Sequence, residues 1–324
     1  MTLVPFIARR IAHGIIVLWT VATVVFFMYF VAPNDVARLT AGRQADPATV
    51  AAVTRKLGLN RPLLDQYVSY LGRLIHGNLG YSFSNTEPVN SLIHQAFPVT
   101  LSVAIGGAVL WLILGVGAGV LAAVRRRTVI DRVVTALTLF FYSMPTFLLG
   151  ELLLLGLFYE LHLAGFDFFS GQGYVSFSQS PASWAQHLLL PWLTIALVSA
   201  ATYARLTRAS LSDVLEEDYI RTARAKGLSS WRIITLHGLR SALTPIVTQF
   251  GLDVGTLLGG VVVTEEVFGL PGLGQLIVTS IDHQDLPTIM GLVLLASTFV
   301  VVANIVVDVC YVLLDPRVRL SEAG

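Results

Sequence analysis

Long apolar stretches dominate this sequence and limit what the chain can fold into. A helix needs roughly 20 predominantly apolar residues to cross the hydrocarbon core of a bilayer, and six stretches of the chain approach or exceed that length. They are residues 11–32, 99–124, 133–159, about 184–204, about 245–263 and 289–314. Charged residues make up only 13% of the 324 residues, against about 25% in an ordinary soluble domain. We therefore expect an all-α integral membrane protein with six transmembrane helices, in which residues 1–324 form a single transmembrane domain.

Two of these stretches need comment before they are taken as spanning helices. The third contains Pro145, which does not exclude a spanning helix because neighbouring helices can satisfy the freed backbone groups. The first follows Arg9 and Arg10, as a cleaved signal peptide would. Its apolar core is longer than that of a signal peptide, and no clear small-residue cleavage site follows it. We therefore expect an uncleaved membrane anchor.

The distribution of basic residues predicts how the chain crosses the membrane, because short cytoplasmic loops are enriched in Lys and Arg. Most of the 21 basic residues lie near the N-terminus, after the second stretch, within residues 205–244 and in the C-terminal tail. The opposite side carries them only within residues 33–98, while its other connections, about 160–183 and 264–288, are acidic. This pattern predicts six spans with both termini in the cytoplasm.

Residues 33–98 are too long for a tight loop, and we expect them to form an extracytoplasmic helical segment. Helix start and stop signals and the apolar spacing predict three short helices there, over residues 46–58, 61–77 and 86–97. These helices could lie on the membrane surface, or they could form a docking surface for an external partner. The sequence leaves both interpretations open.

Several kinds of chemistry have no support in this sequence. A phosphate-binding loop needs glycines followed by Lys and then Ser or Thr, and neither Lys56 nor Lys226 stands in that context. The segment "GLPGLG" at 269–274 lacks such a lysine, so we interpret it as a turn. No serine-hydrolase elbow or zinc-protease motif occurs, and the seven histidines are not spaced as metal ligands. We expect no catalytic residue and no metal site.

Three acidic residues within the apolar stretches are candidates for a solute pathway: Glu151, Asp253 and Asp308. Ionisable groups are costly in lipid and usually face the interior of a helix bundle or an aqueous path. The alternative is that each of them caps a helix or pairs locally, as Asp308 could with the nearby Arg317.

The segment 205–244 contains a short polar pattern of helix, glycine and helix. Residues 206–215 keep a helical pattern, which extends the fourth stretch beyond the membrane. Residues 219–226 make about two turns with acidic residues before them and basic residues at their end, which matches the helix dipole. Gly227 then suits a left-handed cap, and Ser229 suits the N-cap of a second helix near Trp231.

A two-turn helix is marginal in water unless it packs on something. We interpret the pattern as a plug for a groove on another protein. The alternative is a basic topology signal lying on anionic lipid.

At this point the sequence resembles a known family. "DYIRTARAKGLSSWRIITLHGLRSALTPIV" is similar to the cytoplasmic EAA loop of binding-protein-dependent ABC importer permeases, particularly those of the dipeptide, oligopeptide and nickel group. "LGLNRPLLDQYVSYLGRLIHGNLGYSF", "YSMPTFLLG", "EEVFGLPGLGQLI" and "VDVCYVLLDPRVRL" resemble the same group. The resemblance covers nearly the whole chain. The long outside segment resembles that of the first permease subunit of such a heterodimer.

The resemblance implies a type I ABC importer permease in a bacterial plasma (inner) membrane. Its partners would be a homologous second permease, two ATPase subunits, an external substrate-binding protein and membrane lipid, with no nucleic acid. ATP and Mg would be bound by the ATPase subunits, so this chain would hold no cofactor. The substrate implied is a di- or oligopeptide, with nickel or another small solute as the alternative. An ion-coupled secondary transporter is a more distant alternative, since it would usually show internal repeats.

The resemblance also assigns a role to the polar loop, as the coupling helix that sits in a groove of the ATPase. Gly227 matches the invariant glycine of the family motif. The residues carried over with it are Tyr219, Arg221, Thr222, Ala223, Arg224, Ala225 and Lys226. The chain departs from the general consensus at Arg221, where Glu is usual, and at Thr222, where Ala is usual. "HGLR" replaces the later Ile-x-Leu-Pro, with Pro245 following it.

Overall fold

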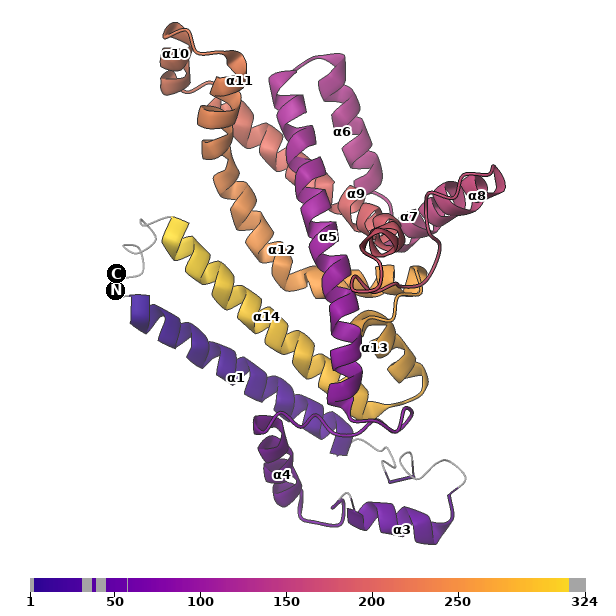
Figure 1. Ribbon diagram of the computed structural model, residues 1–324. Coiled ribbons are helices and arrows are strands. Elements are labelled where there is room, and N and C mark those ends of the chain that lie inside the picture. The colour runs from indigo at the N-terminus through magenta and orange to yellow at the C-terminus, as the bar shows by residue number, and fades with distance from the viewer. Residues whose placement is uncertain (1–2, 31–36, 39–44, 57, 315–324) are drawn as a thin grey trace. The chain divides into compact units, whose positions relative to one another are not determined.

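The protein is almost entirely helical, as the sequence predicts (Figure 1). The computed structural model describes residues 3–30, 37–38, 45–56 and 58–314. Within these residues the β-structure is limited to an isolated antiparallel bridge between Tyr81 and Pro88. Contacts divide the chain into two units, Met1–Phe97 with Leu276–Gly324, and Pro98–Gln275. That residues 1–324 form one transmembrane domain stays a prediction.

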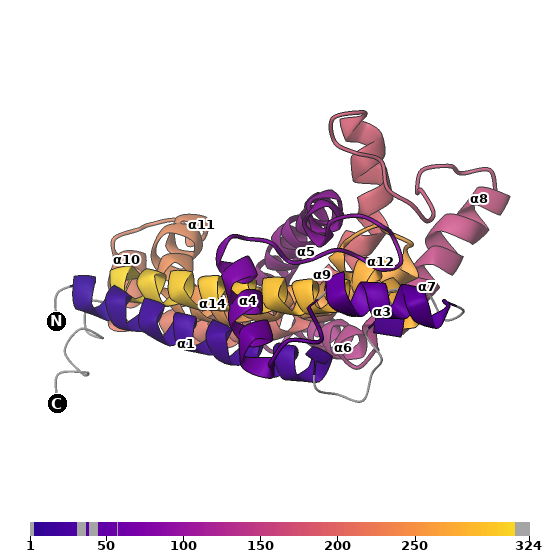
Figure 2. The same cartoon turned by 90° about the horizontal axis from the view of Figure 1, so that it is seen from below.

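Two long helices, α1 (Leu3–Phe30) and α14 (Leu286–Leu314), form the frame of the first unit and lie side by side in opposite directions (Figures 1 and 2). Gly14 lets them approach closely, because a Cβ there would lie 2.6 Å from Cγ1 of Val301. Apolar helices gain no hydrophobic driving force from association in lipid, so small residues that permit close backbone contact favour their packing.

A short helix of the 33–98 segment, α4 (Leu63–Ile75), packs one face against α1. The Tyr67 and Thr23 hydroxyls share a hydrogen bond of 2.7 Å, and the rings of Tyr70 and Phe26 have centroids 5.5 Å apart. The other face of α4 leaves apolar side chains exposed, among them Leu64, Val68 and Ile75. Such a face suits either a membrane surface or a protein partner, so both interpretations of this segment stay open.

Two of the three short helices predicted for the segment are confirmed, as α3 (Pro47–Lys56) and α4. The third prediction, a separate helix over residues 86–97, is wrong. Those residues run into one 36-residue helix, α5 (Val89–Val124), with Pro98 inside it. Pro98 removes one intrahelical hydrogen bond without ending the helix.

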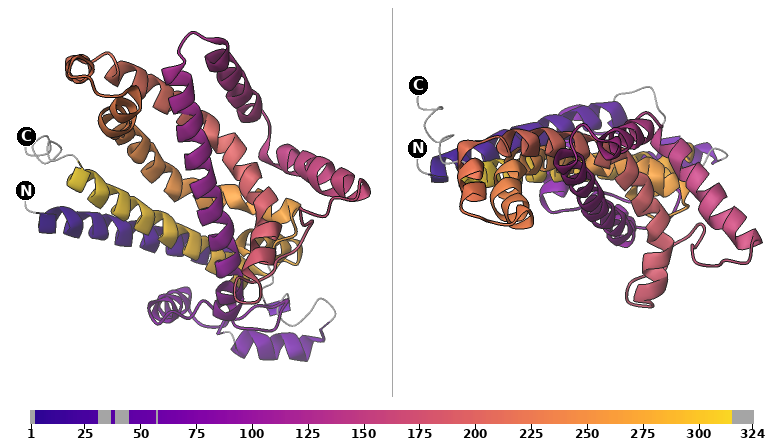
Figure 3. Two further views of the ribbon diagram at one scale, coloured as in Figure 1. Left: turned by 45° about the horizontal axis from the view of Figure 1, so that its top comes forward. Right: turned by 90° about the horizontal axis from the view of Figure 1, so that it is seen from above.

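Three long helices form the frame of the second unit: the part of α5 from Pro98 on, α9 (Pro181–Val214) and α12 (Leu239–Val267). α9 and α12, salmon and orange in Figure 3, make the most extensive helix contact. α5 approaches α9 through glycines, since a Cβ at Gly115 would lie 2.6 Å from Cβ of Tyr203. At Gly119 it would lie 2.5 Å from Cβ of Thr207. The apolar core of this unit includes Trp111, Leu188, Tyr203, Ile246 and Phe268.

Five helices among the described residues are long and apolar enough to cross a membrane. They are Ile7–Phe30, Val89–Val124, Thr146–Leu163, Pro181–Val214 and Leu286–Val307. The first, second, fourth and sixth predicted spans are thus confirmed as helices with shifted ends. α9 continues to Val214, as the pattern over residues 206–215 predicts. The predicted fifth span is helical as part of the 29-residue α12, although α12 is not among the five.

The third predicted span, residues 133–159, is wrong as a single helix. α6 (Val129–Tyr142) ends there, and α7 (Thr146–Leu153) begins after Pro145, whose ψ of 138° is extended. Proline disfavours the helical conformation of the residue before it, here Met144, so the chain breaks at this point. A π-helical segment, η1 (Leu154–Glu160), and α8 (Leu161–Leu163) complete the candidate span Thr146–Leu163.

Candidate functional site

The polar loop after α9 forms a compact two-turn helix, α10 (Asp218–Ala225). Its end is closed as the sequence predicts, with Gly227 at φ +78°. The N–H of Gly227 donates to the carbonyl of Arg224 at 3.0 Å, and the N–H of Leu228 donates to that of Ala223 at 3.3 Å. These two bonds make a Schellman cap, which needs the left-handed conformation that glycine adopts without strain.

The loop has one buried face, which anchors it to the rest of the second unit. Ile220 and Ile233 are fully or almost fully buried, and Ala223 packs with them. Leu215 and Leu228 complete this cluster. A helix of two turns is marginal by itself in water, and this packing stabilises it.

The opposite face presents most of the coupling residues predicted from the family motif. Ala223 and Gly227 are structural positions, one packed and the other capping. The remaining six are exposed: Tyr219, Arg221, Thr222, Arg224, Ala225 and Lys226. The surface is basic, with Arg221 paired to Asp218 at 3.2 Å in an exposed contact.

A second short helix, α11 (Ser230–Arg232), follows and begins as predicted. The Ser229 hydroxyl accepts from the N–H of Arg232 at 3.4 Å as its N-cap. A π-helical turn, η2 (Ile233–Gly238), then joins α11 to α12. Trp231 is 74% exposed and Leu236 is 58% exposed. From the sequence, Trp231 was predicted only to lie near a helix start. An aromatic side chain in a basic loop is the signal that could have marked it as a functional residue.

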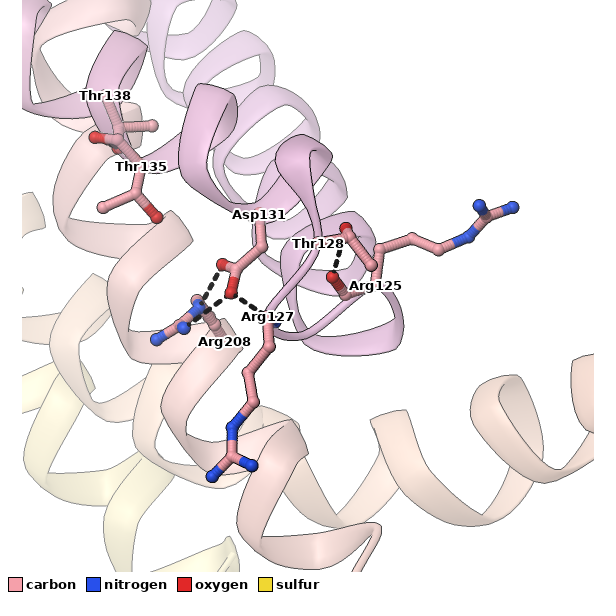
Figure 4. A network of polar contacts seen from close by, with 7 residues as sticks. All are labelled: Arg125, Arg127, Thr128, Asp131, Thr135, Thr138 and Arg208. Atoms are coloured by element: carbon pink, nitrogen blue, oxygen red, sulfur yellow. Dashed lines mark hydrogen bonds and ion pairs between the residues drawn. The ribbon is translucent and has the colours of Figure 1, made fainter.

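An ion pair ties the first turn of α6 to α9, close to the start of this loop (Figure 4). Arg208 on α9 donates to both carboxylate oxygens of Asp131, at 2.7 and 2.9 Å, and the N–H of Arg127 adds a third bond at 2.9 Å. Asp131 is 5% exposed. The Arg208 guanidinium and then the Arg127 N–H lower the pKa of Asp131 to about 2. An exposed pair joins Arg126 to Glu216 at 2.6 Å.

Asp253, one of the three pathway candidates, lines a cavity of ≈ 290 Å³ within the second unit. The Tyr203 hydroxyl donates to one of its carboxylate oxygens at 2.7 Å, and the Gln249 amide donates to the other at 2.9 Å. Ser199 and Thr202 add hydroxyls to the wall. α5, α6, α7, α9 and α12 all contribute to the lining.

Of the other two candidates, Glu151 is not brought to this cavity. Glu151 on α7 is exposed on the surface of the chain and is absent from the cavity lining. Asp308 lies in α14, and its side chain is outside the described residues. Within the part of the chain that the structure describes, no group of His, Cys, Asp and Glu could hold a metal ion.

A buried carboxylate, Glu265, organises the segment after α12. One of its oxygens accepts from the N–H of Gly274 at 2.6 Å and from the N–H of Gln275 at 3.3 Å. A Cβ at Gly272 would lie 2.3 Å from this carboxylate. "GLPGLG" is thus the turn that the sequence predicts, and Gly269 within it has φ +57°. Its partner Glu265 was missed, because no local pattern joins a buried carboxylate to glycines up to nine residues away.

In the first unit, the carboxylate of Asp285 holds a loop in place by hydrogen bonds. It is fully buried and accepts from the Ser84 and Thr288 hydroxyls, both at 2.8 Å, from the N–H of Phe83 at 3.1 Å, and from the Ser82 hydroxyl. Burial alone would raise the pKa of Asp285, but these hydrogen bonds outweigh it and lower the pKa. Asp285 therefore fixes residues 82–84 to the start of α14.

Together, the fold and the site define an all-helical, multi-pass membrane protein with an exposed basic helix–glycine–helix loop. Residues 115–320 match the family described as binding-protein-dependent transport system inner membrane component, and residues 3–104 match the N-terminal part of that family. The chain belongs to this family. It is therefore a non-catalytic inner membrane component of a bacterial ABC importer, a class that works with an ATPase and a binding protein.

Full-length relatives support this assignment. The chain is 40% identical over 314 residues to the glutathione transport system permease protein GsiC of Escherichia coli (strain K12), covering 97% of this chain and 98% of the relative. It is 38% identical over 314 residues to the probable peptide ABC transporter permease protein y4tP of Sinorhizobium fredii, covering 97% and 99%. A putative peptide transport system permease protein of Brucella abortus is 38% identical over 313 residues, with 97% and 98% covered.

A solved structure with 14% identity, titled as an amino acid ABC transporter with histidines, covers 70% of this chain and 94% of its own with a TM-score of 0.48.

Proposed function

We propose that this chain is the first permease subunit of a heteromeric type I ABC importer that moves di- or oligopeptides into the cell. The observation that carries the proposal is end-to-end similarity to permeases named for peptide or glutathione transport, combined with the capped loop. Nickel or another small solute is the alternative substrate. In this proposal the chain crosses the membrane six times, with α12 as the fifth span and both termini in the cytoplasm.

The capped loop would be the part of this chain that binds an ATPase subunit and moves with it. The six exposed side chains of 219–226 and the exposed Trp231 offer basic and aromatic groups. The buried face joins α10 to the end of α9 and to η2, which leads into α12. ATP binding would close the ATPase pair, and the loop would transmit this movement to the helices. A ligand shifts such an equilibrium only through contacts that differ between the two states, so the loop must keep its shape to act. ATP and Mg would be held by the ATPase subunits.

The cavity at Asp253 would form this subunit's share of the solute path. An ionisable group in a spanning region usually faces an aqueous path or the bundle interior, and this cavity offers hydroxyl, amide and carboxylate groups. Asp253→Asn keeps the shape and removes the charge. We expect it to lower peptide uptake while leaving assembly with the ATPase intact.

Reconstitution tests the proposal directly. The chain is co-expressed with a second permease and two ATPase subunits, and the complex is placed in liposomes with the cognate binding protein. We expect peptide accumulation that requires both ATP and the binding protein. Accumulation of Ni²⁺ instead of peptide would select the alternative substrate, and transport by the chain without an ATPase would refute the importer assignment.

The proposed topology has its own test. Cys310 is the one cysteine of the chain, so Cys310→Ser provides a background for single-cysteine variants. Thr222→Cys on the loop and Asn85→Cys in the 33–98 segment are both exposed. A membrane-impermeant maleimide added to intact spheroplasts should label the second variant and spare the first. Labelling of both, or the reverse pattern, would overturn the orientation.

A further inference from the structure

The helix α4 of the first unit has three sides that differ in chemistry. Successive residues of a helix are about 100° apart around its axis, which sorts the side chains by direction. The first side packs into an apolar cluster and consists of Tyr67, Tyr70, Leu71 and Leu74. The second side is polar and consists of Asp65, Gln66, Ser69 and Arg73. The third side lies next to the packed one and is apolar but exposed, with Leu64, Val68 and Ile75.

The packed side of α4 reaches residues that lie inside two candidate spanning helices. On α1, the Tyr67 and Thr23 hydroxyls share a hydrogen bond of 2.7 Å, and the span of α1 ends at Phe30. On α14, the same apolar cluster includes Leu294, and that span begins at Leu286. At 1.5 Å per residue, Thr23 and Leu294 lie roughly 10 Å inside the ends of their spans. Helix α4 therefore packs at the level of the outermost turns of both spans.

The surface of α1 at this level shows what surrounds α4. Val24, Phe27 and Met28 lie within the last two turns of the α1 span and are also exposed and apolar. Such side chains on a spanning helix suit lipid tails, which are as apolar as they are. The exposed apolar side of α4 lies at the same level, so it meets the same surroundings.

The depth and the chemistry of α4 match one class of membrane helix. Interfacial helices have a polar face and an apolar face, and the apolar face lies about 5–10 Å into the boundary between headgroups and acyl chains. A water-soluble partner would contact surfaces beyond the headgroups instead. Tyr67, Tyr70 and Tyr29 of α1 gather at this level, and tyrosine is enriched where a membrane meets water.

We infer that α4 is an interfacial membrane helix, whose side formed by Leu64, Val68 and Ile75 contacts the acyl chains of the leaflet in which α1 ends. Its packed side fixes it to α1 and α14, and its polar side faces headgroups and water. Of the two interpretations of the 33–98 segment, the membrane surface therefore applies to α4. The inference requires only that α1 and α14 cross the membrane, and it is independent of the transported solute and of the coupling loop.

Spin labels on the sides of α4 test this inference. Leu64→Cys and Val68→Cys are made in the Cys310→Ser background and labelled with a nitroxide. The full-length chain, with the subunits that co-purify with it, is placed in nanodiscs of phosphatidylethanolamine and phosphatidylglycerol. Collisions of each label with O₂, which concentrates in the bilayer, and with a water-soluble nickel chelate are then measured by power saturation.

Two reference positions calibrate the result. Ser69→Cys is the matched control, because Ser69 follows Val68 directly and is exposed on the polar side. Val17→Cys marks the interior of the bilayer, because Val17 is exposed near the middle of the α1 span. We expect the ratio of O₂ to nickel collisions at Leu64 and Val68 to be several-fold higher than at Ser69. It should stay below the ratio at Val17, since the helix lies at the boundary.

Three results would overturn the inference. A label at Val68 that meets the nickel chelate as often as the label at Ser69 would place the third side in water. A label that meets neither O₂ nor the chelate would show that protein covers this side. A ratio at Val68 that changes when the cognate binding protein is added would make the third side a docking surface.

Discussion

The loop around Gly227 and the turn around Gly272 both depend on glycine, but for different physical reasons. At Gly227 a Cβ would meet nothing within 4 Å, and the backbone is left-handed with φ +78°. At Gly272 a Cβ would lie 2.3 Å from the Glu265 carboxylate. The first glycine therefore sets the direction of a chain that presents its side chains outward. The second makes room for a buried charge, which holds its segment in place from within.

This difference separates residues that stabilise the fold from exposed residues that are available to a partner. A substitution that disturbs the Glu265 network should act on folding. A substitution on the outer face of α10 or α11 should leave folding intact and act on coupling. Four substitutions test this separation, and they are ordered by their expected effect on stability.

Gly272→Ala should cost about 3–5 kcal/mol of folding free energy, because overpacking is added to the displacement of a buried carboxylate. Thermal unfolding of the purified complex in detergent measures the effect. Gly117→Ala is the matched control, since Gly117 lies in α5 with open space around its Cβ, and alanine is favoured over glycine in a helix. Equal stability of the two variants would mean that Glu265 does not need this close contact.

Asp131→Asn should cost about 2–3 kcal/mol, because it removes charge-assisted hydrogen bonds from Arg208 and the Arg127 N–H. The folded pKa of about 2 lies below the unfolded value of 3.8, so the Asp131 contribution is full above about pH 4 and is lost as the pH falls toward 2.

The difference in unfolding midpoint between wild type and Asp131→Asn should therefore be constant from pH 6 to 8. It should shrink below pH 4. Arg126→Ala breaks an exposed pair and should cost less than about 1 kcal/mol. A larger loss for Arg126→Ala than for Asp131→Asn would contradict the assignment of the stronger contact to Asp131 and Arg208 (Figure 4).

Gly227→Val should cost about 1–2 kcal/mol, the strain of a left-handed conformation for a residue with a Cβ. Its larger effect should be on coupling, because the Schellman cap sets the direction of α10. In proteoliposomes, we expect membrane insertion and ATPase assembly to persist while peptide uptake per ATP hydrolysed falls several-fold. Normal uptake by this variant would remove Gly227 from the coupling role.

Trp231→Ala should change folding stability by no more than about 0.5 kcal/mol, since the side chain is 74% exposed. Aromatic side chains often dominate interface energies, so we expect about 10-fold weaker association with the ATPase subunits. Leu163→Ala is the control, as Leu163 is 66% exposed and lies outside the loop. Loss of stability with no change in association would mean that Trp231 serves folding and not the contact with the ATPase subunits.

Local patterns in the sequence predicted the local structure well. Hydropathy located four spanning helices, and the order of charged residues, glycine and serine located both helices of the loop and its cap. The prediction failed at Pro145. Because proline is tolerated in spanning helices, a single helix was predicted across it, but the helix ends before this residue. The separate helix predicted over residues 86–97 was wrong, because Pro98 does not break α5, to which these residues belong from Val89 on.

The networks between distant residues could not be read from the sequence. Arg208 was used only as a sign of orientation, and its partner Asp131 lies 77 residues away. Asp285 reaches Ser84 across 201 residues. Such pairs depend on how helices pack, and a single sequence carries no periodicity that reports this packing. The loop was predictable because its dipole pattern and its caps depend on neighbouring residues, from the acidic residues before α10 to Ser229.

The glycine contacts between α5 and α9 bear on how the protein is assembled during synthesis. Helices that insert separately must find each other within the bilayer, where close backbone contact at small residues favours association. A chain cut within residues 164–179 should therefore yield two fragments that pair when co-expressed and that purify together. Gly115→Leu in one fragment should weaken that pairing, because α9 leaves no room for a side chain at this position, while the contact between α1 and α14 still joins the fragments. The close contact between α5 and α9 would thus help the two halves of the protein to associate specifically during membrane insertion.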